Sequence, residues 1–140
     1  MRLEELRKKP HLSASSINQY IDCSLAYRFS KIDQIKPEFT SDALVFGSCI
    51  HKVLEYLYNE KMLGRKTSLL DLLNLFEKFW RMDAEGNTRI KYKPGNDFDS
   101  MLMEGKSLLT VYYTSLPEDN FKVIGVEEAF ELHIPGIPIC

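Results

Sequence analysis

The sequence has few cysteines, no long apolar run and no strong excess of charge of one sign. Its three cysteines, Cys23, Cys49 and Cys140, are an odd number without a CxxC pair. That pattern argues against a disulfide framework, and this chain alone cannot form a four-cysteine metal site. No apolar run approaches the roughly 20 residues that cross a bilayer, and the start, MRLEELRKKPHL, is charged where a signal peptide is apolar. We therefore expect a cytoplasmic protein without membrane contact.

The charge balance gives little information about a nucleic-acid partner. The formal net charge is −2, so no basic field covers the whole molecule. An enzyme that cuts DNA can still concentrate its positive charge locally. The length of 140 residues and the hydrophobic content of 44% suit one soluble domain with a substantial core.

Helical periodicity dominates the chain as far as residue 116. Residues 1–10 are charged, end in Pro10, and are expected to be a flexible lead-in. A serine at position 13 or 15 is suited to cap the first helix, because its side-chain oxygen accepts free backbone N–H groups. Apolar spacing then predicts helices at 12–32 (one helix, or two short ones broken near Cys23), 42–63, 68–82 and 98–116. Residues 33–41 and 83–97 are expected to be loops.

The pattern changes after the fourth helix. The segment KVIGVEEAFELHI, residues 122–134, alternates as a strand does, and Pro135-Gly136 is typical of a turn before a second strand. We therefore predict an α+β chain: about four helices followed by one β-hairpin or an incomplete sheet. A lone hairpin leaves unpaired edges. Helices could cover it, a second copy could pair with it in a dimer, or the natural chain could continue; we favour continuation.

The sharpest chemical motif is FGSCIHKVLE, residues 46–55. On a helix, Gly47, His51 and Glu55 are four residues apart and share one face. The missing side chain at Gly47 leaves room beside the imidazole for a ligand, a metal or a backbone. The alternative is an interior histidine bonded to a carboxylate, with Gly47 allowing close helix packing. His51 and Glu55 alone are too few ligands for a metal site.

A second candidate is the acidic pair in the predicted strand. Alternation places Glu128 with the apolar face and Glu127 on the opposite one. A strand carboxylate beside a helix histidine would suit Mg²⁺ or Mn²⁺, since hard cations prefer oxygen donors. The alternative is a solvated strand whose wet side carries Glu127.

The first helical segment offers a modest basic and aromatic patch. Tyr27, Arg28 and Lys31 would suit a phosphate backbone, or equally the charged outer side of a packed helix. Cys23, judged by its neighbours alone, is expected to be a small buried hydrophobe.

Two further features of the sequence are weaker. Lys91 and Lys93, in the predicted loop, are ambiguous in the same way as the first patch. Glu104-Gly105-Lys106 spells E-x-K, but it falls within a helical period and not on a strand, so we do not regard it as catalytic.

Three segments in order resemble RecB-like nuclease domains of the PD-(D/E)XK superfamily. They are LSASSINQYIDCSLAYRFSKI, the Gly-x-x-x-His helix ALVFGSCIHKVLE, and VIGVEEAFEL. The resemblance covers roughly residues 11–140, with the central helix as its most specific part. One departure is Ser24, where the family often has proline after the cysteine.

The resemblance implies a metal-dependent DNA nuclease of recombination, repair or CRISPR adaptation, often an exonuclease. By position, His51 would be the catalytic, metal-ligating histidine, and Glu127 the strand glutamate, with Glu128 as the register alternative. Residues 11–140 would be the N-terminal part of an α/β domain whose sheet is flanked by helices. The catalytic Asp and the D/E-x-K strand would follow Cys140, so these 140 residues alone would be inactive.

The resemblance also implies cofactors and partners. Mg²⁺ or Mn²⁺ would serve the intact domain. Cys23 would match the first of four cysteines that hold an iron–sulfur cluster in some members. DNA would be the substrate, and a helicase partner or a fused helicase domain is possible. The competing interpretations are a non-catalytic helical module that binds nucleic acid or protein, and a structural domain that dimerises through the edge at 122–134.

Overall fold

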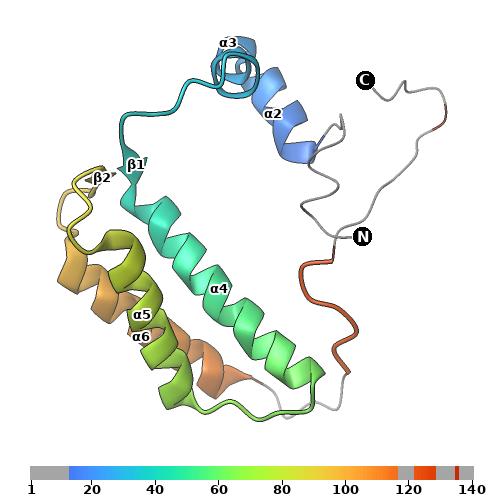
Figure 1. Cartoon of the computed structure of the whole chain (residues 1–140), viewed down its shortest axis with the longest axis vertical. Helices are drawn as coiled ribbons and strands as arrows, with labels where there is room; N and C mark the ends of the chain where they lie inside the picture. The colour runs from blue at the N-terminus through green and yellow to red at the C-terminus, as the bar shows by residue number, and fades with distance from the viewer. Residues whose placement is uncertain (1–12, 117–121, 129–134, 136–140) are drawn as a thin grey trace. The chain divides into compact units, whose positions relative to one another are not determined.

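The computed structural model describes residues 13–116, 122–128 and 135 (Figure 1). The chain divides into two compact units. The first comprises Met1–Pro37 with Glu127–Cys140, and the second comprises Glu38–Val126. Each unit is described by itself. None of the described helices combines the length and the apolarity needed to cross a membrane.

The described part of the first unit is a series of short helical pieces. They are α2 (Ala14–Asp22), α3 (Ser24–Tyr27) and the π-helical turn η1 (Arg28–Ile32). Ser13 caps α2 by accepting a hydrogen bond from the Ser16 N–H over 3.2 Å. Cys23 is extended, with φ −160° and ψ 101°, and interrupts the helix there. The predicted break near Cys23 is therefore confirmed, as is Ser13 as the cap.

The second unit is built on three longer helices, α4 (Asp42–Met62), α5 (Leu69–Ala84) and α6 (Phe98–Ser115). In Figure 1, α5 lies beside both α4 and α6, and it packs against each of them. All three predicted helices are confirmed to within two residues at their ends. Their starts follow from side-chain caps at Ser41, Ser68 and Asp97, the last two as reciprocal capping boxes. Gly64, at φ 73°, follows the end of α4 in the left-handed conformation that glycine favours.

The core of the second unit is largely aromatic. Trp80 and Phe76 of α5 are fully buried and stack at 6.4 Å between ring centroids. Phe46 of α4 contacts both rings edge-on, at 5.9 and 6.1 Å. Gly105 of α6 lies against the Phe76 ring, and an added Cβ there would overlap it. The small size of Gly105 therefore explains how α6 approaches the Phe76 ring so closely.

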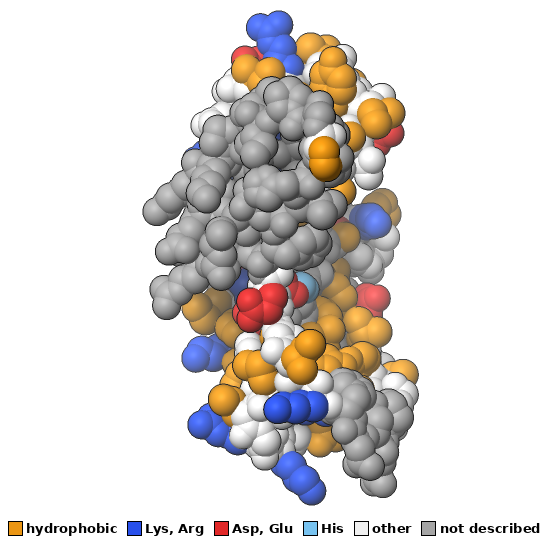
Figure 2. Space-filling view, turned by 90° about the vertical axis from the view of Figure 1, so that its right-hand side faces the viewer, with side chains coloured by type: hydrophobic (Ala, Val, Ile, Leu, Met, Phe, Trp, Pro, Cys, Tyr) orange, Lys and Arg blue, Asp and Glu red, His pale blue; other side chains and the backbone are white. Residues whose placement is uncertain are grey.

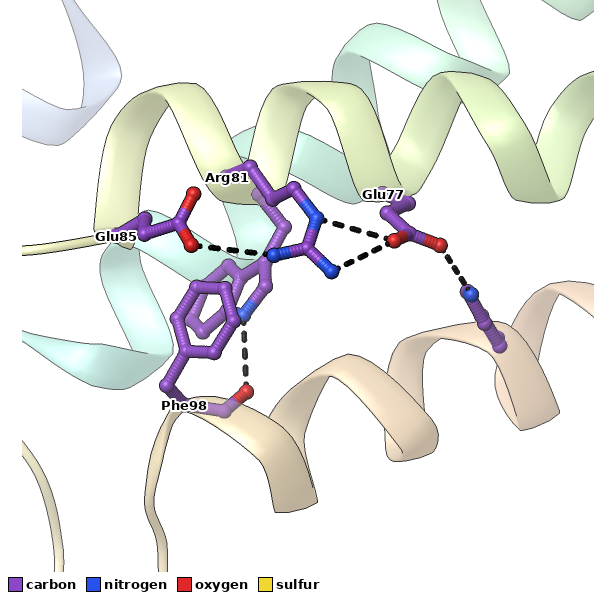
Figure 3. A network of polar contacts seen from close by, with 6 residues as sticks. Glu77, Arg81, Glu85 and Phe98 are labelled. Carbon is purple, nitrogen blue, oxygen red and sulfur yellow. Dashed lines mark hydrogen bonds and ion pairs between the residues drawn. The ribbon is translucent and has the colours of Figure 1, made fainter.

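A line of ionic contacts borders the α5–α6 interface (Figure 3). Arg81 donates to Glu77 over 2.9 Å and to Glu85 over 3.2 Å. Glu77 also pairs with Lys106 of α6, so one carboxylate links the two helices. Beneath them, Trp80 Nε1 donates to the Phe98 carbonyl over 3.0 Å. Lys106 therefore has a structural partner, in agreement with our dismissal of the E-x-K sequence as catalytic.

A very small parallel sheet joins the two predicted loops. Strand β1 (Thr40–Ser41) pairs with β2 (Ile90–Lys91), with Thr40 opposite Ile90. The Thr40 N–H also donates to the Arg89 carbonyl over 2.9 Å. Both strands fall in the predicted loops 33–41 and 83–97, and the prediction of loops is wrong at these four positions. The helix-rich α+β class is confirmed.

The strand predicted from residue 122 onward is wrong for its described part. Residues 122–128 contain no strand, and Glu127 lies in the left-handed region at φ 52°. A strand needs a neighbour to pair its backbone groups, and the described residues pair none with this segment. The positive φ also breaks the side-to-side alternation on which the prediction rested. Residues 129–134, the rest of that prediction, lie outside the described residues.

Hydrophobic side chains remain at the surface of both units. On the face drawn in Figure 2, they lie among basic and acidic side chains. In the first unit Ile21 is 73% exposed and Ile32 is 67% exposed. The predicted apolar positions of 12–32 therefore do not form a buried core within the described part of that unit.

Candidate functional site

The histidine motif lies on the solvent side of α4. Gly47, His51 and Glu55 are all exposed, whereas Cys49 and Val53 on the other side of the helix are fully buried. The prediction that the three residues share one face is confirmed. The alternative of an interior histidine is wrong, because the core takes the opposite side of the helix.

Open space surrounds Gly47. A Cβ built at this position meets no heavy atom within 4 Å. Gly47 therefore does not serve helix packing, which was the other half of the alternative. Glycine in a helix interior costs roughly 1 kcal/mol relative to alanine, and no contact of this glycine offsets that cost. Among the described residues, the space next to Gly47 that a side chain would enter is therefore empty.

Glu127 and Glu128 are both exposed. They belong to the first unit, and His51 belongs to the second. The shared pocket of His51 with either glutamate therefore stays a prediction. Among the described residues, 13–116, 122–128 and 135, no three His, Cys, Asp or Glu side chains gather as a metal site. What the described residues supply is an exposed imidazole with a carboxylate, Glu55, one turn further along α4.

Cys23 is exposed and caps α3 with its sulfur, which accepts from the Ala26 N–H over 3.4 Å. The interpretation as a buried hydrophobe is wrong, because the chain breaks at Cys23 instead of burying it. Its predicted role as an iron–sulfur ligand stays a prediction.

The basic and aromatic patch of the first unit is formed by consecutive turns. Tyr27 ends α3, and its ring meets that of Tyr20 edge-on at 5.5 Å. Arg28 pairs with Asp33 over 3.3 Å, and both Arg28 and Lys31 are exposed in η1. An exposed ion pair of this kind contributes little to stability, so the Arg28 guanidinium can exchange this partner for another anion.

Cys49, Lys52 and Asp83 form a polar cluster between α4 and α5. Lys52 Nζ lies 2.7 Å from Asp83 Oδ2, and Cys49 Sγ donates to the same oxygen over 3.6 Å. Burial, followed by the nearby Asp83 charge, raises the pKa of Cys49 to about 11. A thiol with that pKa is almost entirely protonated at neutral pH and is a poor nucleophile. The cluster borders a shallow hollow of about 420 Å³ lined by Thr40, Leu44, Val45, Ser48, Met82 and Asp83.

Asp42 carries a buried carboxylate that no sequence pattern indicates. This side chain is fully buried and accepts from three donors: the Ala43 N–H at 2.8 Å, the Lys93 N–H at 3.0 Å and Asn96 Nδ2 at 2.9 Å. The hydrogen bond from Asn96, then that from Lys93, lowers the pKa of Asp42 below its ordinary value. The sequence offered only an aspartate in the first turn of a helix, where it is usually exposed and complements the helix dipole.

Comparison with known proteins gives one match. A family model described as the PD-(D/E)XK nuclease superfamily matches residues 11–138. No curated protein and no solved structure matches the chain.

Proposed function

Because this chain belongs to the PD-(D/E)XK nuclease superfamily, which suggests metal-dependent nuclease activity, we propose that the protein hydrolyses phosphodiester bonds in DNA. The observation that carries the proposal is His51, which is exposed on α4 one turn after Gly47, where an added Cβ would meet no heavy atom of the described residues within 4 Å. A nuclease must admit a bulky, charged backbone to its metal, and Gly47, His51 and Glu55 are exposed together on this face of α4.

We propose that His51 is one ligand of a divalent ion, Mg²⁺ or Mn²⁺. The residues fit in part: the imidazole of His51 is exposed, and Glu127 and Glu128 are exposed carboxylates of the kind that hard cations prefer. Glu127 is the proposed acid and Glu128 its alternative. We further propose that the catalytic Asp and the D/E-x-K pair follow Cys140. When bound, such an ion polarises a phosphate and lowers the pKa of a water.

The residues of this chain would then hold His51 in a fixed position and orient it toward the metal ion. The α4 backbone fixes His51 at the solvent face, because its opposite side is anchored in the core by Cys49 and Val53. Gly47 keeps the adjacent turn clear of side-chain atoms. A ligand placed on a rigid helix is positioned more accurately than one on a loop.

More specifically, we propose that the protein is a RecB-like nuclease, an exonuclease or endonuclease of recombination, repair or CRISPR type. It is supported by the order of the three segments that resemble that family, at 12–32, 43–55 and 123–132. A helicase partner or a fused helicase domain goes with this assignment, as does a cytoplasmic location.

Two further roles are proposed for the first unit. Tyr27, Arg28 and Lys31 would contact DNA, supported by their succession on α3 and η1 and by the exposure of both cations. Cys23 would ligate an iron–sulfur cluster, supported by its exposure and its free thiol.

The deciding experiment is metal titration of cleavage by the intact protein. We expect linear DNA to be digested in Mg²⁺ or Mn²⁺ and left whole in EDTA, and His51→Ala to abolish digestion while the fold is kept. The matched control is Ser48→Ala, three residues earlier on the exposed side of α4, which should cleave normally. Residues 1–140 alone should not digest DNA.

Two results would count against the proposal. Near-normal cleavage by His51→Ala would remove His51 from the site. DNA binding without any metal-dependent cleavage would favour the non-catalytic binding module instead.

A further inference from the structure

Residues 89–93 carry three exposed basic side chains in and beside strand β2 (Ile90–Lys91). Arg89, Lys91 and Lys93 are exposed, while Ile90 between them is buried and Tyr92 is half-buried. From Ile90 to Lys93 this is the alternation expected of an extended chain with one face on the core, and Arg89 lies in the turn just before β2. The three cations, which we call the basic strip, are therefore all accessible to solvent.

The backbone beneath the basic strip is held at several points. Ile90 and Lys91 pair with Thr40 and Ser41 in the two-stranded sheet, and the Arg89 carbonyl accepts from the Thr40 N–H. At the other end, the Lys93 N–H donates to the buried carboxylate of Asp42 over 3.0 Å. Because the segment is already ordered, little backbone entropy is lost when its side chains bind a ligand.

Three carboxylates of this unit are engaged elsewhere, while Arg89 Nε donates to the backbone carbonyl of the exposed Glu38 over 3.5 Å. Asp42 is buried and accepts three hydrogen bonds, Asp97 caps α6 through Ser100, and Glu85 pairs with Arg81. In the part of the chain that the structure describes, no carboxylate lies within ion-pair distance of the amines of Lys91 or Lys93. A protein of net charge −2 thus keeps a local group of positive charges.

We propose that the basic strip binds the phosphate backbone of the DNA substrate, an inference that rests on the proposed nuclease function. Side chains two residues apart on one face of an extended chain are separated by about 6.6 Å. One DNA strand has a phosphate about every 3.4 Å along the axis, so the strip matches roughly every second phosphate.

The position of the strip relative to His51 supports this assignment. Strand β1, which pairs with the strip, leads directly into α4 at Asp42, and His51 follows nine residues later on the same helix. At 1.5 Å per residue this separation is about 14 Å along the helix axis, or about four phosphate steps. The strip therefore lies near the start of the helix that carries the proposed metal ligand.

The test is the salt dependence of DNA binding, measured in EDTA so that no cleavage occurs. A fluorescein-labelled DNA of random sequence is titrated with the wild-type chain and with Arg89→Gln/Lys91→Gln/Lys93→Gln at several KCl concentrations. Loss of three phosphate contacts should reduce the slope of log K against log salt by about 2 to 3, and the affinity at low salt at least about tenfold. Lys91→Gln/Lys93→Gln, which keeps Arg89, should show about two thirds of the slope change.

The matched control removes the same charges elsewhere. Arg65→Gln/Lys66→Gln/Lys78→Gln also replaces one arginine and two lysines, all exposed in the same unit. It should leave the slope within about 1 of the wild type. The fluorescence of Trp80 verifies that each variant is folded.

Three results would overturn the basic strip: no binding of DNA by the wild-type chain, an unchanged slope in the strip variants, or an equal fall in the control. The proposed function fails separately. If the strip variants bind with the wild-type slope while the intact protein cleaves DNA in Mg²⁺, only the strip is rejected. If the slope falls as expected but no metal restores cleavage, the nuclease function is rejected and the strip stands.

Discussion

The side-chain amide of Asn96 donates a hydrogen bond to Oδ2 of Asp42 across 2.9 Å, between residues 54 positions apart in the sequence. The same oxygen accepts the Lys93 N–H. One buried carboxylate thereby ties the first turn of α4 to the segment that bears the basic strip. The stability of this contact bears on both the helix of His51 and the proposed DNA contacts.

Replacing Asp42 by alanine should destabilise the second unit by about 3 kcal/mol, because buried hydrogen-bond donors lose a charged acceptor. The measurement is urea unfolding followed by the emission of Trp80, the only tryptophan in the chain. Asp99→Ala, an exposed aspartate in the first turn of α6, is the control and should change stability by less than about 1 kcal/mol. Equal effects of the two substitutions on the free energy of unfolding would mean that the buried hydrogen bonds of Asp42 do not stabilise the fold.

The wild-type protein should be more stable than Asp42→Asn at neutral pH, and acid should reduce this difference in the free energy of unfolding. The pKa of Asp42 is lowered in the folded state, chiefly by the bond from Asn96, so the unfolded chain takes up this proton first as the pH falls. The stabilisation is therefore complete above the ordinary carboxyl pKa of 3.8 and is lost as the pH falls through the lowered value. Unfolding at pH 7, 5, 4 and 3 should show the gap between wild type and Asp42→Asn narrowing below about pH 4. A gap that widens in acid would contradict this.

Gly105→Ala should destabilise the helical core by about 1–3 kcal/mol through overpacking, since the new methyl group would overlap the buried Phe76 ring. Trimming the ring with Phe76→Leu should relieve the overlap. We expect the double variant to lose less stability than the two single variants together, by at least about 0.5 kcal/mol. Strict additivity would show that Gly105 and Phe76 are not in contact.

His51→Ala should leave thermal stability nearly unchanged, within about 0.5 kcal/mol, because the side chain is exposed on α4. Its effect should appear in metal binding by the intact protein, measured by calorimetry with Mn²⁺. We expect affinity to fall at least about tenfold, as the loss of a ligand requires. A large drop in melting temperature with metal affinity retained would assign the imidazole a structural role.

The cysteines should differ in their reaction with iodoacetamide at pH 8. Cys23 is exposed, so it should be alkylated within minutes, whereas Cys49 should resist because it is buried and burial raises its pKa to about 11. Mass mapping of tryptic peptides distinguishes the two sites. Urea should make them react alike, and fast labelling of Cys49 in the native protein would contradict the packing of α4 on α5.

The helices could be predicted because residues close to each end determine where the helix starts and stops. Ser68 and Gly64 mark a start and a stop within one turn of the residues they affect, and Cys23 falls where the apolar period is interrupted. The β1–β2 pairing could not be predicted in this way. It is a bridge of two residues per strand between segments some fifty residues apart, too short to show a period of two.

The candidate site likewise has features that local sequence predicts and features that it does not. Helical spacing was sufficient to place Gly47, His51 and Glu55 on one face, which the structure confirms. The burial of Asp42 depends on a donor from Asn96, a distant residue that no local pattern indicates. Alternation alone predicted a strand at 122–128, but a strand also needs a partner, and a single sequence does not reveal which segment that would be.

The bridge between Thr40 and Ile90 closes a chain segment that contains all of α4 and α5. During folding, the adjacent helices can dock through contacts near in sequence, and the bridge then closes over ends already drawn together. We therefore expect this corner to form late and its amide hydrogens to exchange before those of the middle turns of α4 and α5 in the native state. Transient opening there would loosen the proposed DNA-gripping segment while the imidazole further along the helix keeps its place.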